Sequence, residues 1–175
     1  MDIEPTAEIR KFMGDLENSG ATLKMVDQDK IHITVKFLGD TEEGDIKEIS
    51  ETVRTILKKH EPFDLVIRGA GAFPHMDYMK VIWVGVENAD RLEKIAHEIE
   101  EELVPMGFSR AEKSFSPHIT LARVKGGKNK EELAQVVRRY RDTDFFKHKT
   151  TKLRLKESVL KPEGPEYKTL EEYFL

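Results

Sequence analysis

Apolar and polar positions along the chain follow two periods, and each period predicts a type of element. Apolar residues three to four positions apart are typical of an amphipathic helix, whereas alternation or a short apolar run is typical of a strand. Helices are predicted at 6–17, 41–60, 90–103 and 131–140. Strands are predicted at 31–38, 63–68, 81–86, 116–123, 152–160 and 167–175.

Capping and turn residues mark the ends of these elements. Thr6 is a predicted N-cap of the first helix, and Thr41 is expected to open the second. Asn88 or Asp90 is expected to cap the third helix. The Gly-Ala-Gly run at 69–71 predicts a turn that ends the strand 63–68.

The order of the elements is more informative than their number. They run helix, strand, helix, strand, and then strand, helix, strand, helix, strand, strand, without a continuous series of βαβ units. This order predicts an α+β protein with two similar lobes and mainly antiparallel sheets. At 175 residues, the chain is expected to be a single two-lobed domain spanning 1–175.

Composition excludes several classes of protein. The chain has no cysteine, which rules out disulfides, Cys-ligated zinc, Fe–S clusters and a thiol nucleophile. No apolar run reaches the roughly 18 residues that a membrane span needs, and the N-terminus lacks the features of a signal peptide. We therefore expect a cytoplasmic protein without a membrane partner.

Charge is distributed unevenly along the chain. The formal net charge is −4, but the segment 123–154 holds 11 basic and four acidic residues, a local balance of +7. Such a segment could receive an anionic ligand such as an RNA backbone. A solvated lysine-rich helix and strand would give the same count, and both interpretations remain open at this stage.

One short motif occurs twice. His-Ile-Thr stands at 32–34 and again at 118–120, each time inside a predicted strand with a helix before it and a turn and helix after it. Residues i and i+2 of a strand point to the same face. Each copy therefore presents an imidazole beside a hydroxyl. If the two lobes are related by an approximate two-fold axis, His32, Thr34, His118 and Thr120 converge on one groove.

The segments His32–Gly39 and Ser116–Arg123 resemble those of the two-histidine phosphoesterase superfamily. Within it, the chain is most similar to the bacterial and archaeal RNA 2′,3′-cyclic phosphodiesterases, also called 2′-5′ RNA ligases. The apolar run 81–86 and the ending 160–167 also look like this family's. The resemblance implies a bilobal, pseudo-two-fold α+β fold, in which two antiparallel sheets flank a central groove and the helices lie outside.

The resemblance also implies an activity and a substrate class. The expected reaction is metal-independent hydrolysis of a terminal 2′,3′-cyclic phosphate of RNA to a 2′-phosphate, reversible as 2′-5′ ligation. Imidazoles serve as acid or base near neutral pH, and hydroxyls can donate to phosphate oxygens. No cofactor or metal is expected, and a monomer is expected. The alternative is a non-catalytic module that binds RNA or nucleotides.

Two further residues are implied by the family as substrate contacts, Phe37 and Arg123, each five positions beyond its histidine. An aromatic ring and a guanidinium could hold a nucleobase between them. Strand parity points both residues away from the groove. Either the strand bulges or bends after the threonine, or Phe37 belongs to the core. His75, after Phe73 and Pro74, is another possible substrate contact.

Two expectations complete the sequence-based picture. His32 is assigned as the acid toward the departing 3′-oxygen, and His118 as the base for water. Alignment of the two lobes on their motifs sets the apolar strand 81–86 against the very start of the chain. The first strand of the N-terminal lobe is therefore expected to be missing or truncated.

Overall fold

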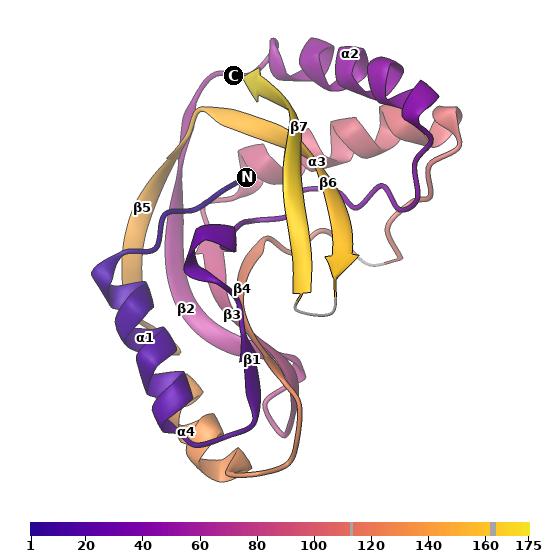
Figure 1. Ribbon diagram of the computed structural model, residues 1–175. Helices are drawn as coiled ribbons and strands as arrows, with labels where there is room; N and C mark the ends of the chain where they lie inside the picture. Colours follow the sequence, from indigo (N-terminus) through magenta and orange to yellow (C-terminus); the bar gives the residue numbers. More distant parts are fainter. Residues whose placement is uncertain (113, 162–163) are drawn as a thin grey trace.

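A computed structural model describes residues 1–112, 114–161 and 164–175 and shows an α+β fold (Figure 1). Pro162 and Glu163, which belong to the family-like ending, lie outside the described residues. The helices of the described part are α1 (Ala7–Asn18), α2 (Ile46–Leu57), α3 (Asp90–Leu103) and α4 (Lys130–Arg139). The strands are β1 (Leu23–Met25), β2 (Phe63–His75), β3 (Tyr78–Glu87), β4 (His118–Val124), β5 (Asp144–Thr150), β6 (Lys152–Lys161) and β7 (Gly164–Phe174).

Five strands form one antiparallel sheet in the order β1-β4-β3-β2-β5, and β6 pairs with β7 in a second antiparallel sheet. Figure 1 shows the larger sheet as a curled layer, with the β6–β7 hairpin lying separately from it. The predicted α+β class with mainly antiparallel sheets is therefore confirmed.

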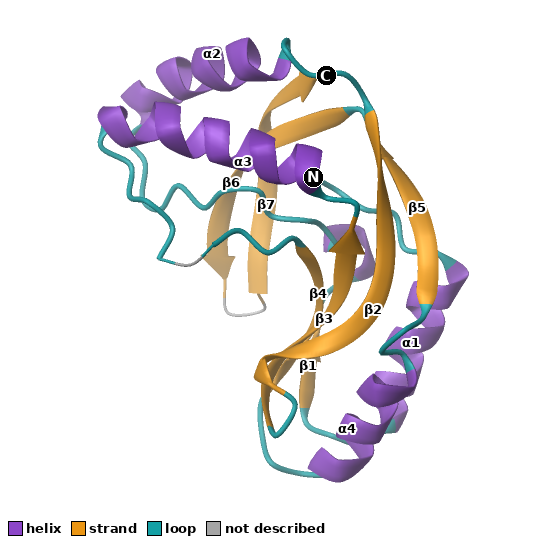
Figure 2. Cartoon of the chain, turned by 180° about the vertical axis from the view of Figure 1, so that it is seen from behind, coloured by secondary structure: helices purple, strands orange, loops and turns teal. Residues whose placement is uncertain are grey.

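The helices pack in two pairs at opposite ends of the molecule (Figure 2). Helix α1 lies against α4, and α2 lies against α3 and β7. The apolar stripe predicted for the first helix is buried, and its Phe12 ring stacks on Tyr140 with the ring centroids 4.3 Å apart. At the other end, His60 Nε2 lies 2.8 Å from a carboxylate oxygen of Glu98, which links the segment after α2 to α3. None of the helices in the described ranges is long and apolar enough to cross a membrane.

The prediction of a strand at 31–38 is mostly wrong. Only His32 and Ile33 pair, as isolated bridges, and residues 35–39 form neither a helix nor a strand. The edge of β4 that this segment would extend along is already taken by β1 and by Val26, whose N–H donates to the carbonyl of Leu121. The Lys36 ammonium instead binds Glu100 and the carbonyl of Ser109, which directs the chain toward α3.

The turn predicted at 69–71 is also wrong, because β2 continues through it to His75. The glycines produce an irregularity in the pairing with β3 between Ile67 and Ala70. Gly69 has a φ of 72°, and a Cβ there would lie 2.7 Å from the carbonyl oxygen of Arg141. Glycine therefore permits a bulge here rather than a reversal of the chain.

The second helix begins later than predicted. The Thr41 hydroxyl donates to the carbonyl of Gly39 instead of capping a helix, and α2 starts at Ile46 after a short 3-10 turn. Strands β1 and β5 were not anticipated. Strand β5 lies in the basic segment, where the strand-favouring residues Phe145, Phe146 and Thr150 are the signal that could have identified it.

The first residues of the chain lie beside the His32 segment. The N–H of Ile3 donates to Ile31, the N–H of Ile33 donates to Met1, and Asp2 bridges His32. This is a short pairing rather than a full strand, and the expectation that the first strand is truncated stays a prediction.

Candidate active site

The two His-Ile-Thr segments lie side by side. Ile33 and Ile119 form an antiparallel bridge, so His32 lies across from Thr120 and Thr34 across from His118. Both isoleucines are fully buried. The polar residues on either side of them point to the opposite face and are partly exposed. The structure thus brings all four predicted polar side chains onto one face.

This register also fixes the approximate separation of the two histidines. His32 and His118 are diagonal neighbours across the antiparallel pair, a relation in which the backbones lie about 7–8 Å apart. Each histidine is directly opposite a threonine, where Cβ atoms are about 4.5–5.5 Å apart. Two imidazoles at this spacing can approach a single phosphate group from its two sides.

The same local contact orients both imidazoles. Nδ1 of His32 lies 2.7 Å from the carbonyl oxygen of Lys30, and Nδ1 of His118 lies 2.8 Å from that of Ser116. A carbonyl oxygen only accepts, so Nδ1 is the protonated nitrogen in both rings. Nε2 makes no hydrogen bond within the described residues, and it is therefore the nitrogen that can exchange a proton with a substrate.

An aromatic ring also lies edge-on to each imidazole. Tyr167 of β7 is 5.2 Å from His32 at an interplanar angle of 71°, and Phe73 of β2 is 5.0 Å from His118 at 84°. Edge-to-face packing restricts the rotation of both rings. Sequence reasoning missed these two residues, because no local pattern shows which strands approach the histidines.

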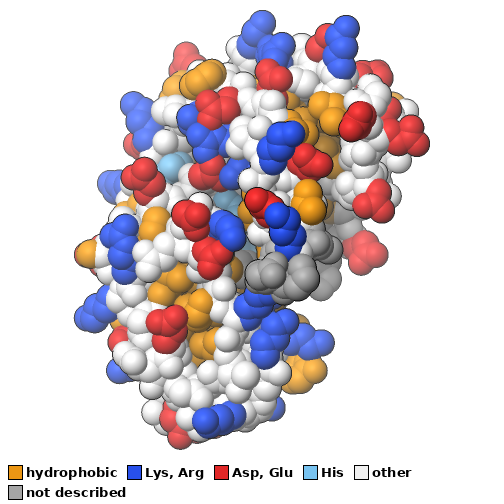
Figure 3. Space-filling view, in the orientation of Figure 1, with side chains coloured by type: hydrophobic (Ala, Val, Ile, Leu, Met, Phe, Trp, Pro, Cys, Tyr) orange, Lys and Arg blue, Asp and Glu red, His pale blue; other side chains and the backbone are white. Residues whose placement is uncertain are grey.

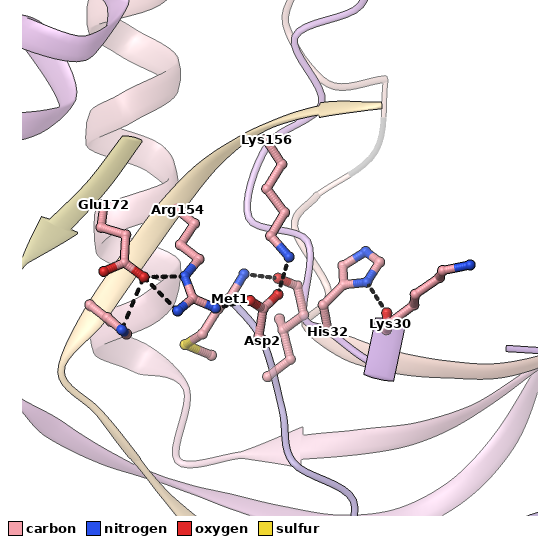
Figure 4. Close-up of polar contacts among 9 residues, drawn as sticks. Met1, Asp2, Lys30, His32, Arg154, Lys156 and Glu172 are labelled. Carbon is pink, nitrogen blue, oxygen red and sulfur yellow. Dashed lines mark hydrogen bonds and ion pairs between the residues drawn. The ribbon is translucent and has the colours of Figure 1, made fainter. Parts of the chain in front are cut away.

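The surroundings of the two histidines differ in charge. Beside His32, the carboxylate of Asp2 binds Arg154 and Lys156 of β6, and Arg154 also binds Glu172 of β7 (Figure 4). The Lys156 ammonium lies over the Tyr167 ring, 5.8 Å from its centroid. A bridging pair in a sheet projects its side chains to the same face, so this charged cluster borders the face that holds His32.

Burial lowers the pKa of His32 below its usual value, and the ammonium groups of Met1 and Lys156 act in the same direction. The carbonyl of Lys30 and the carboxylate of Asp2 oppose this effect without cancelling it. Burial would raise the pKa of Asp2, but hydrogen bonds from Lys156 and Arg154 hold it below its usual value. A lowered pKa favours neutral His32 at pH 7, which supports a base rather than the acid assigned from sequence.

Arg123 reaches the same face because β4 bulges after Thr120. Thr120 pairs with Trp83 and Ala122 with Ile82, so β4 contains one residue more than β3 at this point. Arg123 consequently pairs with Val81, which lies on the same side of β3 as Trp83. The bulge resolves the conflict with strand parity and points the exposed Arg123 side chain to the face of His118.

Phe37 is not part of the core, because its side chain is 82% exposed. It follows the irregular segment after Thr34, where strand parity no longer applies. The interpretation of Phe37 as core packing is therefore wrong, and its role in substrate contact stays a prediction.

Trp83 pairs with Thr120 and therefore lies on the same face of the sheet. A Cβ on Gly71 would lie 2.4 Å from the Trp83 ring, so glycine at this position lets the indole lie directly on β2. The close approach of a ring to a strand backbone is a common reason for a glycine inside a strand. This is the signal in the Gly-Ala-Gly run that a turn assignment overlooked.

The basic segment 123–154 does not form one continuous strip. Strand β4, which carries Arg123, is separated from β5, with Lys147 and Lys149, by β3 and β2. Arg154 lies on the second sheet and is paired with Asp2 and Glu172. Figure 3 shows Lys and Arg side chains spread among Asp and Glu on this view, with histidine side chains reaching the surface between them.

The residues described offer no group of three or more His, Asp or Glu side chains that could hold a metal ion. The polar side chains that do converge are two imidazoles and two hydroxyls from different segments, with Arg123 nearby. This donor set suits proton transfer and binding of an anion rather than a metal centre.

Comparison with known proteins connects this geometry to a family. Residues 5–155 match the model of the 2′-5′ RNA ligase superfamily. RNA 2′,3′-cyclic phosphodiesterase of Methanothermobacter thermautotrophicus is 36% identical over 95% of this chain and 90% of its own length. The protein of the same name from Aeropyrum pernix is 38% identical over 94% of this chain and 93% of its own length.

Solved structures agree with this match. The crystal structure of TT0787 of Thermus thermophilus is 25% identical, with a TM-score of 0.78 over 99% of this chain and 94% of that chain. Escherichia coli LigT complexed with 3′-AMP has the same fold, with a TM-score of 0.73 at 22% identity and the same coverage. The family match over most of the chain, together with the paired histidine segments, shows that this protein belongs to the 2′-5′ RNA ligase superfamily.

Proposed function

We propose that this protein hydrolyses terminal 2′,3′-cyclic phosphates of RNA to 2′-phosphates, using His32 and His118 as its base and acid. The observation that carries the proposal is the antiparallel pairing of the two His-Ile-Thr segments, which sets both imidazoles on one face with Nε2 unbonded among the described residues. The names of the curated relatives support the same substrate class.

In the proposed reaction, Nε2 of neutral His32 takes a proton from water, whose oxygen attacks the phosphorus. The bond from phosphorus to the 3′-oxygen breaks, and that oxygen takes a proton from Nε2 of His118. The products are a 2′-phosphate and a 3′-hydroxyl, and exchange with solvent restores both imidazoles. The carbonyl partners of Nδ1 keep each Nε2 directed toward the phosphate throughout.

Thr34, Thr120 and Arg123 hold the phosphate in this scheme. The two hydroxyls lie directly across from the two histidines, and Arg123 reaches the same face through the β4 bulge. Hydrogen bonds and positive charge at the non-bridging oxygens stabilise the charge that builds up in the transition state. Phe37, exposed at the edge of this segment, is proposed to contact the nucleobase opposite Arg123.

The proposed binding place is a central groove between the five-stranded sheet and the β6–β7 hairpin, with the two segments related by an approximate two-fold axis. The matching Nδ1 contacts and edge-on aromatic rings support this relation. The same site acting on a 5′-hydroxyl in place of water would join two RNA ends through a 2′-5′ linkage.

The test is an assay with an oligonucleotide that ends in a 2′,3′-cyclic phosphate, carried out in EDTA. We expect conversion to the 2′-phosphate by the wild-type protein and loss of conversion in the variant with both histidines replaced by alanine. Binding without turnover in the wild type would instead support the non-catalytic RNA-binding module. Activity that disappears with chelator and returns with added metal would contradict the metal-independent scheme.

A further inference from the structure

The tip of the β2–β3 hairpin carries a cluster of aromatic and cationic side chains that the proposed reaction does not use. The ring of His75, at the end of β2, lies 6.3 Å from that of Tyr78, at the start of β3. The ammonium of Lys80 lies 5.1 Å from the centroid of the Tyr78 ring. Tyr78 is 51% exposed, so its side chain is accessible from solvent.

The charge of Lys80 is also available. Within the part of the chain that the structure describes, no carboxylate forms an ion pair with Lys80, and the neighbouring Asp77 lies 4.0 Å from Nδ1 of His75 instead. An exposed aromatic ring beside a cation is the arrangement with which proteins bind single-stranded nucleic acid, by stacking on a base and attracting the backbone.

A bulge in β3 places this cluster on the face of the candidate active site. Phe73 pairs with Val81, but Pro74 pairs with Met79, so Lys80 is an extra residue in β3. Met79 packs against the core, which puts the pair formed by His75 and Tyr78 on the opposite face. That opposite face is the one on which Phe73 contacts His118.

The distance from the site suits a neighbouring nucleotide. Val81 pairs with both Phe73 and Arg123, so this row of the sheet marks the edge of the proposed phosphate site. Because Lys80 is an extra residue, the pair formed by His75 and Tyr78 is two residues beyond Phe73 along β2, which corresponds to about 7 Å at 3.3–3.4 Å per residue. In Figure 1 the loop between β2 and β3 lies toward the lower end of the molecule, away from α2 and α3.

We propose that Tyr78, His75 and Lys80 bind the RNA strand next to its terminal cyclic phosphate, with a base stacked on Tyr78 and a backbone phosphate near Lys80. This inference rests on the proposed function and deepens it, because it assigns RNA chains rather than cyclic mononucleotides as the preferred substrates. Phe73 then marks the boundary between the reacting nucleotide at His118 and the preceding part of the strand.

The experiment compares kcat/KM for a 2′,3′-cyclic mononucleotide with kcat/KM for tri- and tetranucleotides that end in the same cyclic nucleotide. We expect the wild-type protein to prefer the longer substrates. Tyr78→Ala should lower the ratio of tetranucleotide to mononucleotide kcat/KM by about 5- to 100-fold, the loss of one stacked base. Tyr78→Trp should preserve the ratio, since every aromatic ring offers a face for stacking. Lys80→Met should lower the salt dependence for the tetranucleotide by about one unit of log–log slope.

Phe174 provides a matched control. It is 65% exposed and lies under the ammonium of Lys152 at 5.8 Å, but Lys152 is paired with Glu172. Phe174→Ala should leave the ratio unchanged. A wild-type protein that hydrolyses both substrates equally well, or a Tyr78→Ala variant with an unaltered ratio, would overturn this inference alone. A wild-type protein inactive on every cyclic phosphate would refute the proposed function instead.

Discussion

His32 and His118 share one local geometry within two different scaffolds. His118 begins β4, an inner strand of the five-stranded sheet, whereas His32 lies in a segment that pairs only through isolated bridges. His118 has the apolar Phe73 at its edge, while His32 has Tyr167 and the cluster of Asp2, Arg154 and Lys156. The contact of each Nδ1 with the carbonyl two residues earlier determines that Nε2 is the nitrogen free to meet a substrate. Elements distant in the sequence determine the charges around each ring.

This difference has a direct chemical consequence. The proposed reaction uses one neutral and one protonated imidazole, and unlike environments favour one assignment of these two forms over the other. The burial of His32 and the nearby ammonium groups lower its pKa, which favours the neutral form. The unlike surroundings of the two motifs therefore support the opposite proton transfers that we propose for them.

Replacing either histidine should have the largest effect. His32→Ala and His118→Ala should each reduce turnover by about 10²–10⁴-fold, because each removes one proton transfer. The double variant should lose less than the product of the two single losses, since both residues act in one transition state. Turnover of a cyclic-phosphate oligonucleotide measures all three, and full activity in either single variant would refute the mechanism.

A substrate with a good leaving group in place of the 3′-oxygen separates the two roles. Such a leaving group needs no acid, so it should restore most of the activity lost in His118→Ala and little of that lost in His32→Ala. Single-turnover rates of the two variants with the two substrates provide the measurement. Restoration of His32→Ala instead would return His32 to the role of acid that the sequence suggested.

Changing the charges beside His32 should have a smaller effect than removing a histidine. We expect it to shift one limb of the pH profile of turnover. Lys156→Met removes a positive charge and should raise the pKa of His32, which moves the acidic limb to higher pH. Asp2→Asn removes a negative charge and frees Lys156, so it should move the same limb to lower pH. The sign follows because a base works only above its own pKa.

The control for this measurement is Lys152→Met, in the same strand but paired with Glu172, which should leave the limb in place. Movement of the basic limb by Lys156→Met would identify His32 as the acid. Identical profiles for all variants would show that the cluster does not act on His32.

The smallest expected effect concerns Arg123. Because the basic segment is divided among distant strands and partly paired, we expect only a moderate fall of oligonucleotide affinity with salt. Arg123→Ala should weaken binding and lower the log–log slope by about one, the contribution of one phosphate contact. Equal slopes for wild type and variant, measured by titration at several salt concentrations, would place Arg123 outside the phosphate site.

Local sequence patterns determined much of this protein. The repeated His-Ile-Thr segments, with strand parity, correctly placed His32 with Thr34 and His118 with Thr120 on single faces, because a two-residue period is a property of the extended backbone itself. The apolar stripes of α1, α2, α3 and α4 were recognisable for the same reason, since they repeat within one element.

Only the tertiary structure decided how these pieces meet. The bulges at Lys80 and after Thr120 change the face to which Tyr78 and Arg123 point. A bulge is a difference in residue number between two paired strands, so neither strand shows it alone. The shortness of the His32 segment depends on β1 occupying the edge of β4, and the approach of Tyr167 to His32 joins residues 135 positions apart. Register between distant segments is set by packing rather than by local preference, so these contacts have no signature in the sequence of either partner alone.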